Sequence, residues 1–337
     1  MKIAIHEKSG KFSPFWIKYC QDNNIDYKLV DVFDNDIVLQ INDCDALMWH
    51  FAHQNYKDKL LAQPILFALE SSGKKIFPNI NTSWHYDDKI GQKYLLETIN
   101  APLIRSYVFT SEVLAHRWVE ESNFPKVFKL RGGAGATNVK LINSKKQAHN
   151  IIKTSFRKGF SQVRWLEKLK SSVIQFRPNK VSTTTILRYL YYYVTGYTDI
   201  LTKHVGKEIG YVYFQDFIAN NNYDTRLIVI NGNKAYGMQR LVRKGDFRAS
   251  GSSQFKYDPI PKEIIEIGFQ VAKKLNLQSV AFDFVIDNGE PKIIELSYGF
   301  GTLGSSKCEG YWDDEYQWHH SKFNPFGWMI EDLLHNK

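Results

Sequence analysis

Residues 279–297, SVAFDFVIDNGEPKIIELS, are the most informative stretch of the chain. Two runs rich in β-branched and aromatic residues flank Asp287-Asn288-Gly289, a turn sequence that predicts a β-hairpin. Each run carries one acid among apolar residues, Asp283 in the first and Glu295 in the second. The stretch therefore predicts an antiparallel strand pair that presents two carboxylates.

The position of the turn predicts how the two acids lie relative to each other. If residues 287–291 form the loop, Ile286 pairs with Lys292, and Asp283 falls directly opposite Glu295. Like charges with Cβ atoms ~5 Å apart destabilise a sheet unless positive charge lies between them. A divalent cation, normally Mg²⁺ shared with nucleotide phosphates and with Mn²⁺ as an alternative, would remove this repulsion. The other reading is two acids that face solvent on an exposed sheet face.

Ser297 follows Glu295 by two residues, so the two side chains share one face of the predicted strand. The serine hydroxyl could complete the ligand set of the metal ion. The predicted metal site therefore consists of Asp283, Glu295 and Ser297.

Residues 125–139, PKVFKLRGGAGATNV, place a lysine at the end of a strand and a glycine-rich turn directly after it. Lys129 would supply a mobile positive charge, while Gly133 and Gly135 would let backbone N–H groups approach phosphate oxygens. The stretch lacks the G-x-x-x-x-G-K-[ST] and G-x-G-x-x-G patterns. We predict a mobile phosphate-binding lid over residues 129–138, and a tight hairpin turn is the alternative.

Three arginines follow in a strand, its neighbour and the next loop: Arg226, Arg240 and Arg248. Their guanidinium groups could converge on a transferring phosphate or a substrate carboxylate. The turn at Asn231-Gly232 leaves the register open, because a two-residue turn puts Gln239 on the Arg226 face and a three-residue loop puts Arg240 there. Exposed arginines on a polar strand face are the alternative for each.

The first ~85 residues alternate between strand and helix patterns, which predicts an open parallel sheet. A further helix over residues 86–100 has Asp87 or Asp88 as its N-cap. Residues 155–204 are rich in aromatic and basic side chains and give no clear pattern. The earlier predicted strands are 3–6, 27–32, 46–50 and 75–77, and the helices are 14–23 and 64–72.

Composition narrows the class of protein. With 337 residues and 43% hydrophobic content, the chain can bury a sizeable core in two or three subdomains. The formal charge of +9 favours a polyanionic partner such as nucleotide phosphates, an acidic substrate or nucleic acid. Three well-separated cysteines fit a reducing cytoplasm, and neither a signal peptide nor an apolar run of ~20 residues is evident, so we expect a soluble cytoplasmic protein.

Taken together, these motifs and their order resemble the ATP-grasp superfamily, most closely its RimK-like carboxylate–amine ligase branch. The resemblance covers roughly residues 88–301. It implies an α/β fold in which an N-terminal open parallel sheet precedes two α+β subdomains that clasp the nucleotide. The implied divisions are 1–86 (N-terminal α/β domain), 87–214 (central subdomain with the lid) and 215–337 (C-terminal subdomain with the metal site).

The resemblance also implies roles for individual residues. Asp88-Lys89 and Lys129 match the two phosphate-binding lysine positions, Asp224 matches the position near the ribose, and Asp283 with Glu295 matches the magnesium ligands. Residues 215–218 are similar to the hinge strand whose backbone meets adenine. The full nucleotide-binding set is Lys89, Lys129, Gly133, Gly135, Gln215, Asp216, Phe217, Ile218, Asp224 and Ser250. Two departures are Ser297, where the family usually has asparagine, and Lys129-Leu130, where lysine-proline is common.

The implied reaction is ATP-dependent ligation: a substrate carboxylate becomes an acyl phosphate, an amine attacks it, and Arg226, Arg240 and Arg248 stabilise the charges that develop. A small-molecule or peptide carboxylate and an amine would be the partners, and a homodimer is left open. The alternatives are a kinase that uses the same nucleotide site, a non-catalytic ATP-binding scaffold, and a basic nucleic-acid-binding protein, for which residues 157–193 show no motif. Histidines such as His50 and His53 are interpreted as structural, with substrate contact as the alternative.

Overall fold

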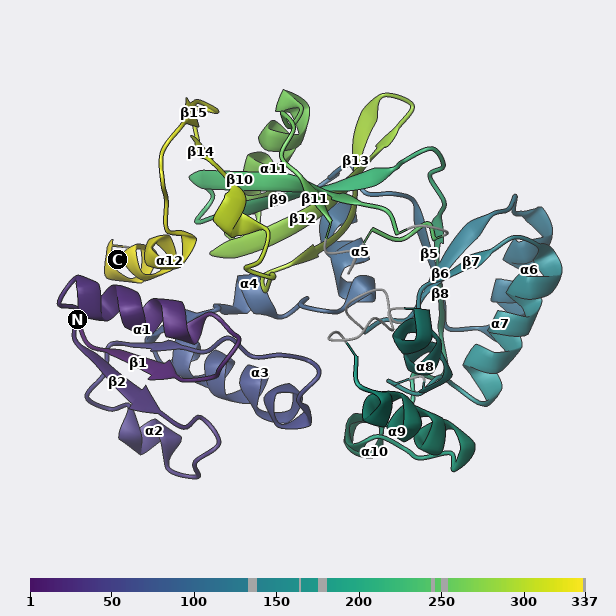
Figure 1. Cartoon of the computed structure of the whole chain (residues 1–337), viewed down its shortest axis with the longest axis horizontal. Coiled ribbons are helices and arrows are strands. Elements are labelled where there is room, and N and C mark those ends of the chain that lie inside the picture. The colour runs from purple at the N-terminus through teal and green to yellow at the C-terminus, as the bar shows by residue number, and fades with distance from the viewer. Residues whose placement is uncertain (133–137, 164, 175–180, 244–245, 250–253, 336–337) are drawn as a thin grey trace. The chain divides into compact units, whose positions relative to one another are not determined.

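The computed structural model describes residues 1–132, 138–163, 165–174, 181–243, 246–249 and 254–335. The chain divides into two compact units (Figure 1). Unit 1 contains residues 1–104 and 218–337, and unit 2 contains residues 105–217. The finer boundaries at 86 and 214 stay a prediction.

The N-terminal sheet of unit 1 has the order β2-β1-β3-β4, and all its strands are parallel, as the alternating pattern predicts. Its third helix begins eight residues before the predicted start at Pro64, because Asn55 caps it by accepting a hydrogen bond from the backbone N–H of Lys57. The strands are β1 (Ile3–His6), β2 (Tyr27–Val30), β3 (Ala46–Met48) and β4 (Lys75–Phe77), and the helices are α1 (Ser13–Asp22), α2 (Ile37–Gln40), α3 (Tyr56–Ser71) and α4 (Ile80–Ser83).

A larger antiparallel sheet forms the rest of unit 1, in the order β13-β12-β9-β10-β14-β15, with β11 paired to β10. Figure 1 shows α12 next to α1, and the Tyr19 hydroxyl donates a hydrogen bond to Glu331 there, at 2.7 Å. The strands are β9 (Tyr223–Ile230), β10 (Lys234–Leu241), β11 (Phe255–Lys256), β12 (Ser279–Asp287), β13 (Glu290–Ser297), β14 (Tyr311–Asp313) and β15 (Trp318–His319). The helices are α5 (Lys89–Thr98), α11 (Lys262–Lys274), the short 3-10 helix η1 (Ser305–Lys307) and α12 (Pro325–His335).

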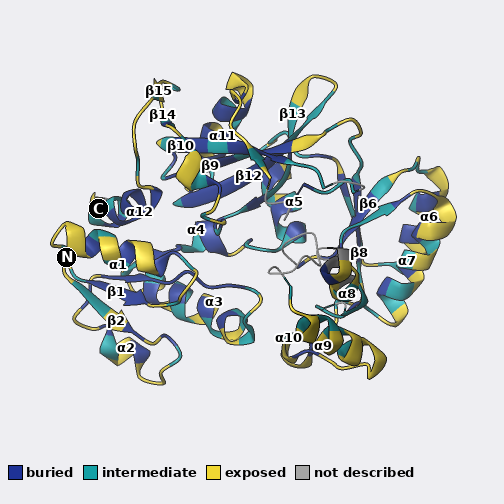
Figure 2. Ribbon diagram, viewed as in Figure 1, coloured by how far each residue is buried: buried dark blue, intermediate teal, exposed yellow. Residues whose placement is uncertain are grey.

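Helix α11 covers one face of this sheet and buries alternate residues of β9 and β12. Phe282 and Phe284 are fully buried beneath it, as is Leu227. Gly268 permits the close approach, since a Cβ there would lie 2.3 Å from the side chain of Leu227. The buried strands are dark blue in Figure 2. Because neighbouring residues in a strand face opposite ways, Asp283 and Arg226 are directed to the other face.

The β12–β13 hairpin places Asp283 opposite Glu295, as predicted, but the turn and the pairing of the residues next to it differ from the prediction. The loop is shorter than expected: Asp287 pairs with Glu290 and Ile286 with Pro291, so the predicted pairing of Ile286 with Lys292 is wrong. The register then shifts by one residue between Asp283 and Phe284. This β-bulge at Ile294 cancels the effect of the tighter turn and returns Glu295 to its predicted partner.

The β9–β10 hairpin resolves the register that the sequence leaves open. Ile230 pairs with Lys234, so the connection is a three-residue loop, with Asn231 and Gly232 at positive φ. Met238 therefore lies opposite Arg226, and Arg240 lies opposite Asp224 on the same face. The three-residue alternative is the one that the structure contains.

Unit 2 is an antiparallel sheet in the order β5-β8-β6-β7 with helices packed on it. Residues 155–204, which give no clear pattern in sequence, are mostly helical in their described part. Helix α9 has no buried residue and is largely yellow in Figure 2. The strands are β5 (Ser106–Phe109), β6 (Lys126–Lys129), β7 (Lys140–Ile142) and β8 (Val212–Asp216), and the helices are α6 (Glu112–Glu121), α7 (Lys145–Arg157), α8 (Trp165–Ile174), α9 (Thr183–Val194) and α10 (Ile200–Val205).

Within the described residues, no helix has the length and apolar character needed to cross a bilayer.

Candidate active site

Two arginines and two aspartates form a buried ion-pair network on the face of the sheet opposite α11. Arg226 donates to Asp283 through Nε (2.8 Å to Oδ1) and Nη2 (2.9 Å to Oδ2). Nη2 of Arg240 donates to the same Oδ2 at 2.7 Å. Arg240 also binds Asp224 through Nε at 2.7 Å and Nη2 at 2.6 Å. Strands β9, β10 and β12 thus each contribute to one network.

Burial and charge act in opposite directions on these carboxyl groups. Burial raises the pKa of Asp283, but the charges and hydrogen bonds of Arg226 and Arg240 outweigh it and bring the pKa to about 2. The pKa of Asp224 is raised, first by burial and then by the nearby negative charge of Asp283, despite its contact with Arg240. The pKa of Arg240 is also raised: burial lowers it, and the two carboxylates more than compensate.

The network changes the argument for a metal ion. Repulsion between Asp283 and Glu295 does not by itself demand a cation, because Arg226 and Arg240 already supply positive charge at Asp283. The oxygen donors still suit magnesium, which often needs only one or two carboxylates together with substrate phosphates. A carboxylate offers about four lone-pair positions, and Asp283 uses three of them on N–H groups.

Magnesium therefore fits the donor chemistry of the hairpin, with Glu295 as the more available ligand. The Glu295 side chain is 35% exposed, whereas that of Asp283 is 4% exposed. Among the described residues, no group of three or more His, Cys, Asp and Glu side chains is arranged to hold a metal ion. A metal at this site would thus depend on ligands from nucleotide or water as well.

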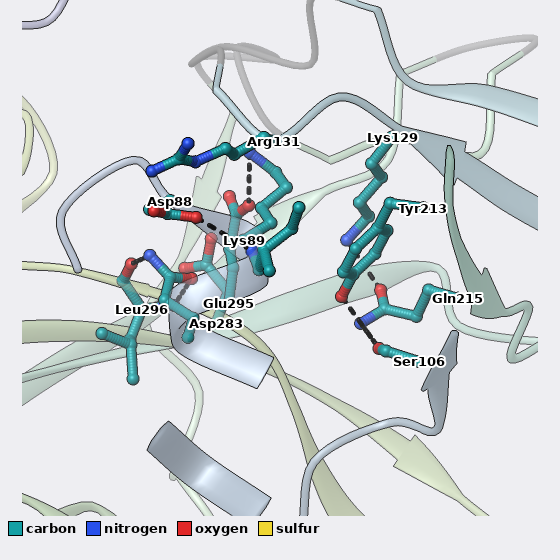
Figure 3. Close-up of polar contacts among 12 residues, drawn as sticks. Asp88, Lys89, Ser106, Lys129, Arg131, Tyr213, Gln215, Asp283, Glu295 and Leu296 are labelled. Atoms are coloured by element: carbon teal, nitrogen blue, oxygen red, sulfur yellow. Dashed lines mark hydrogen bonds and ion pairs between the residues drawn. The ribbon is translucent and has the colours of Figure 1, made fainter. Parts of the chain in front are cut away.

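Lys89 lies beside the β12–β13 hairpin that carries Asp283 and Glu295 (the acid hairpin), because helix α5 is hydrogen-bonded to strand β13. Asp88 caps the helix, accepting hydrogen bonds from the backbone N–H groups of Ile90 and Gly91. One turn along, the Gln92 side chain donates to the carbonyl of Leu296 at 2.8 Å and accepts from its N–H at 3.2 Å. The Lys89 ammonium consequently lies 3.8 Å from Glu295 Oε2. Figure 3 shows the two side chains next to each other.

Ser297 has a structural contact of its own. Its hydroxyl donates a hydrogen bond of 2.7 Å to the carbonyl of Gly299. A hydroxyl that donates still has lone pairs that can coordinate a cation. Its place in the metal ligand set stays a prediction.

Arg248 forms an ion pair within its own loop. Its Nε lies 2.9 Å from each Asp246 oxygen, and its Nη2 lies 2.6 Å from Oδ2. The catalytic role of Arg248 stays a prediction. Three further predicted site residues, Gly133, Gly135 and Ser250, lie outside the described residues, as do residues 133–137 of the predicted lid.

In unit 2, Lys129 is held by a short polar chain. Its ammonium donates to Gln215 Oε1 at 2.7 Å, and the Gln215 amide donates to Ser106 Oγ at 3.1 Å (Figure 3). Tyr213 donates to the same serine oxygen at 2.9 Å. Lys129 and Gln215 are both buried, so the ammonium at the end of β6 has a fixed position.

The neighbouring hinge residues lie where the two units meet along the chain. Asp216 ends β8 and accepts a hydrogen bond of 2.6 Å from Lys126. Phe217 is the last residue of unit 2, and Ile218 is the first residue of the second part of unit 1. The predicted hinge thus coincides with a unit boundary, while adenine binding there stays a prediction.

Sequence reasoning missed Gln92 and the pairing of Arg240 with Asp224. Gln92 is a polar residue in an amphipathic helix, and its partner Leu296 is 204 positions away. No local signal reveals such a contact. The Arg240–Asp224 pair follows directly from the three-residue β9–β10 loop, so its signal is present in the sequence but is ambiguous by one residue.

Comparison with known proteins gives a consistent result for the fold. A family model described as a RimK-like ATP-grasp domain matches residues 198–311. No curated protein matches the sequence. The structure resembles that of the D-cycloserine synthetase DcsG, with a TM-score of 0.62 at 12% identity over 100% of both chains.

Two further solved structures are similar. D-alanine–D-alanine ligase from Bacillus anthracis, in complex with ATP, gives a TM-score of 0.56 at 14% identity, covering 99% of this chain and 97% of that one. A RimK domain protein from Sphaerobacter thermophilus gives 0.57 at 14% identity, covering 99% of each chain. At these identities the likenesses establish the fold, and the activity has to be argued from the site.

Proposed function

We propose that the protein joins a carboxylate to an amine at the expense of ATP. Its residues 198–311 match the RimK-like ATP-grasp domain, and its fold is that of ATP-grasp ligases. The observation that carries this proposal is the acid hairpin with a buried lysine beside it. Asp283 and Glu295 lie opposite each other, and Lys89 approaches Glu295 within the same unit.

The proposed nucleotide-binding residues begin with two lysines. Lys89 and Lys129 would each donate to phosphate oxygens, since each is a buried ammonium at the end of an element. Residues 215–218 would meet adenine through their backbone, and Asp224 would lie near the ribose. Gly133, Gly135, Arg248 and Ser250 complete the proposed phosphate site.

Glu295 and Asp283, with Ser297, would hold a magnesium ion, or a manganese ion in its place. When bound, such an ion would offset the negative charge of the β- and γ-phosphates. Arg226 and Arg240 would hold Asp283 ionised and oriented, because their hydrogen bonds favour its charged form. Glu295 would be the adjustable ligand, since it is the less buried of the two acids.

The proposed reaction has two bond exchanges. A carboxylate oxygen of the first substrate attacks the γ-phosphorus, the bond to the bridging oxygen breaks, and ADP leaves. The amine nitrogen of the second substrate then attacks the carbonyl carbon, loses a proton, and phosphate leaves. Arg226 would stabilise negative charge in both steps, since only its Nε and Nη2 are engaged by Asp283, and Arg240 would support it.

The other parts of the proposal concern partners and location. We expect a small-molecule or peptide carboxylate as the first substrate and do not expect a nucleic acid partner. Homodimer formation and a cytoplasmic location are also proposed, the latter because Cys20, Cys44 and Cys308 are free thiols.

The test is an assay of the purified full chain with ATP, Mg²⁺ and a panel of acids and amines, recording ADP formation and product mass together. A condensed product formed in equal amount to ADP would support the ligase. The Glu295→Gln variant serves as the negative control. ADP formation with a phosphorylated hydroxyl product would identify a kinase, and ADP formation that no acid or amine stimulates would contradict the ligase.

A further inference from the structure

The net positive charge of the chain comes from one segment of unit 2. Residues 153–207 contain eleven lysine and arginine residues and two acids, Glu167 and Asp199. The whole chain has 44 lysine and arginine residues and 35 acids, so the two signs are equal, at 33 each, outside this segment. The formal charge of +9 is therefore the charge of residues 153–207, which supply no residue of the proposed nucleotide and metal sites. Charge gathered in this way points to a polyanionic partner of its own.

The cations of the three helices in this segment face solvent. Lys168 and Lys170 lie on α8, Arg188 lies on α9 and Lys203 lies on α10, and all four are exposed. None of the four has an ion-pair partner among the described residues. Asp199 does not offset them, because it is buried and caps the N-terminus of α10. Their charge is consequently available to a partner.

Helix α9 packs against α8 through one of its faces. The rings of Tyr189 and Tyr192 lie against that of Trp165, with centroids 5.8 and 4.7 Å apart. Tyr192 also stacks on Tyr197 at 4.4 Å, and Trp165 Nε1 donates to the carbonyl of Tyr197 at 2.6 Å. These contacts set the orientation of α9 within unit 2.

The opposite face of α9 carries an apolar stripe. Leu187, Leu190, Tyr191 and Val194 follow the spacing i, i+3, i+4, i+7, which places their side chains along one face of a helix. Their exposed fractions lie between 42% and 73%, and no residue of α9 is buried (Figure 2). A globular protein normally turns such a stripe toward its core. Apolar side chains beside unpaired cations suit a partner that is both anionic and apolar.

The chemistry of the stripe distinguishes between the possible partners. A nucleic acid would use the cations and the aromatic rings, but it offers little for Leu187, Leu190 and Val194 to pack against. A second copy of the chain would bring the same positive surface opposite itself in a two-fold dimer. An acidic protein would need a groove matched to the stripe. An anionic lipid surface needs no such groove: it accepts aliphatic and tyrosine side chains at its interface and attracts lysine and arginine.

We propose that the outer face of α9, together with the cations of α8 and α10, binds a membrane surface that contains anionic lipids. Helix α9 has 12 residues, fewer than the ~20 that a span requires, so it would lie in the plane of the interface. Leu187, Leu190 and Val194 then enter the boundary between headgroups and acyl chains, while Arg188 and Lys203 approach the lipid phosphates. This inference does not depend on the proposed ligase function.

The test measures co-sedimentation of the full chain with sucrose-loaded vesicles of phosphatidylcholine, either alone or mixed with phosphatidylglycerol. The mixed vesicles should bind the chain, and those of phosphatidylcholine alone should bind it at least roughly tenfold more weakly, because a neutral surface does not attract the cations. Raising the ionic strength from about 0.1 M to about 0.5 M should weaken binding to the mixed vesicles, since salt screens exposed charges.

Two matched double variants locate the contact. Val194→Gln with Arg188→Gln removes one aliphatic side chain and one cation from α9. Val113→Gln with Arg117→Gln makes the same exchange on α6 of the same unit, where Val113 is 68% exposed, compared with 73% for Val194. The α9 pair should weaken binding to the mixed vesicles by roughly twentyfold, since it loses both an apolar and an electrostatic contribution. The α6 pair should change it by less than about twofold.

Leu187→Gln repeats the test with a single exchange on the same stripe and should weaken binding by roughly fivefold. Circular dichroism of each variant checks that the helices are retained. Equal binding to the two kinds of vesicle, binding to neither, or equal weakening by the α9 and α6 pairs would overturn the proposal.

Polyglutamate and single-stranded DNA serve as the competing polyanions. Binding of polyglutamate, but not of vesicles, that is lost in the α9 pair would assign the surface to an acidic protein. Retention of DNA that requires Arg188 but tolerates Val194→Gln, again without vesicle binding, would assign it to a nucleic acid. Either result would overturn the assignment to a lipid surface.

Discussion

Arg226 donates two parallel hydrogen bonds to Asp283, from Nε to Oδ1 at 2.8 Å and from Nη2 to Oδ2 at 2.9 Å. The two residues lie opposite each other on β9 and β12, so the register of the sheet sets this contact. Such a bidentate pair fixes the carboxylate in orientation as well as in charge. Asp283 is therefore as much a part of the fold as of the proposed metal site.

Asp283→Asn should destabilise the protein, because it leaves Arg226 and Arg240 sharing a neutral partner in a buried position. We expect a loss of ~3 kcal/mol in the free energy of unfolding, as is typical when one member of a buried ion pair is removed. Glu295→Gln should change this free energy by less than ~1 kcal/mol, since that side chain is more exposed, while it abolishes turnover. Urea denaturation of both variants provides the measurement. Equal stability of the two would show that the network contributes little.

Lys129→Met should weaken ATP binding by ~1–3 kcal/mol, the effect of losing a charged hydrogen bond. Lys126→Met is the matched control from the same strand. Lys126 is paired with Asp216 and is three positions away, so it faces the other side of β6. Calorimetric titration with ATP should show reduced affinity for the first variant alone. Similar affinities in both variants would remove Lys129 from the phosphate site.

Stability should fall as the pH drops from about 6.5 toward 4. Burial lowers the pKa of His50 and His53 to about 3 and that of His85 to about 4. In this pH range these histidines therefore bind protons in the unfolded chain and stay mostly neutral in the folded chain. Only well above pH 6.5, where the histidines of the unfolded chain are also neutral, do they contribute nothing to the slope. Each histidine should lower the free energy of unfolding by ~2 kcal/mol between pH 6.5 and pH 5.

His85→Gln isolates one of these protons. Glutamine does not titrate, and its amide can still donate to the carbonyl of Asn81 that His85 contacts at 3.1 Å. The slope of unfolding free energy against pH should therefore decrease by about one proton between pH 6.5 and 4. An unchanged slope would mean that His85 is protonated in the folded chain as well.

Deletion of Ile294 should be tolerated. The deletion removes the bulge and leaves Ile293 followed directly by Glu295, so a regular ladder still places Glu295 opposite Asp283. Deletion of Ile228 is the control, because β9 is paired on both sides without a bulge, and the remainder of the strand would turn its buried face outward. Circular dichroism and thermal melting should show a folded protein in the first case only. An unfolded Ile294 deletion would mean that the bulge itself is required.

The sequence predicts most of the fold because periodicity is a local property. The parallel strands at residues 3–6 and 75–77 match their predicted bounds, as their apolar runs are sharply terminated. The facing acids were also predicted, although two errors of one residue each, in the turn and in the ladder, cancelled. A bulge has no reliable local signal, since it depends on which residues the sheet must bury.

What the sequence could not provide are contacts between distant segments. Whether Arg226 is free or paired depends on a strand more than fifty residues away, and the distance between Lys89 and Glu295 depends on the link from Gln92 to Leu296. The close packing around Gly299 is also invisible in sequence, because a glycine in a loop reads as a turn. In the structure, a Cβ at this position would lie 2.9 Å from His50 Nε2.

Unit 1 is discontinuous: the chain leaves it after Ile104 and returns to it at Ile218. All of unit 2 is therefore synthesised before β9, β10, β12 and β13. Domains generally fold as units and in order of synthesis. The network of Asp224, Arg226, Arg240 and Asp283 depends on the last third of the polypeptide, so a polypeptide that ends at residue 217 would contain all four strands of the β5-β8-β6-β7 sheet and none of these four side chains.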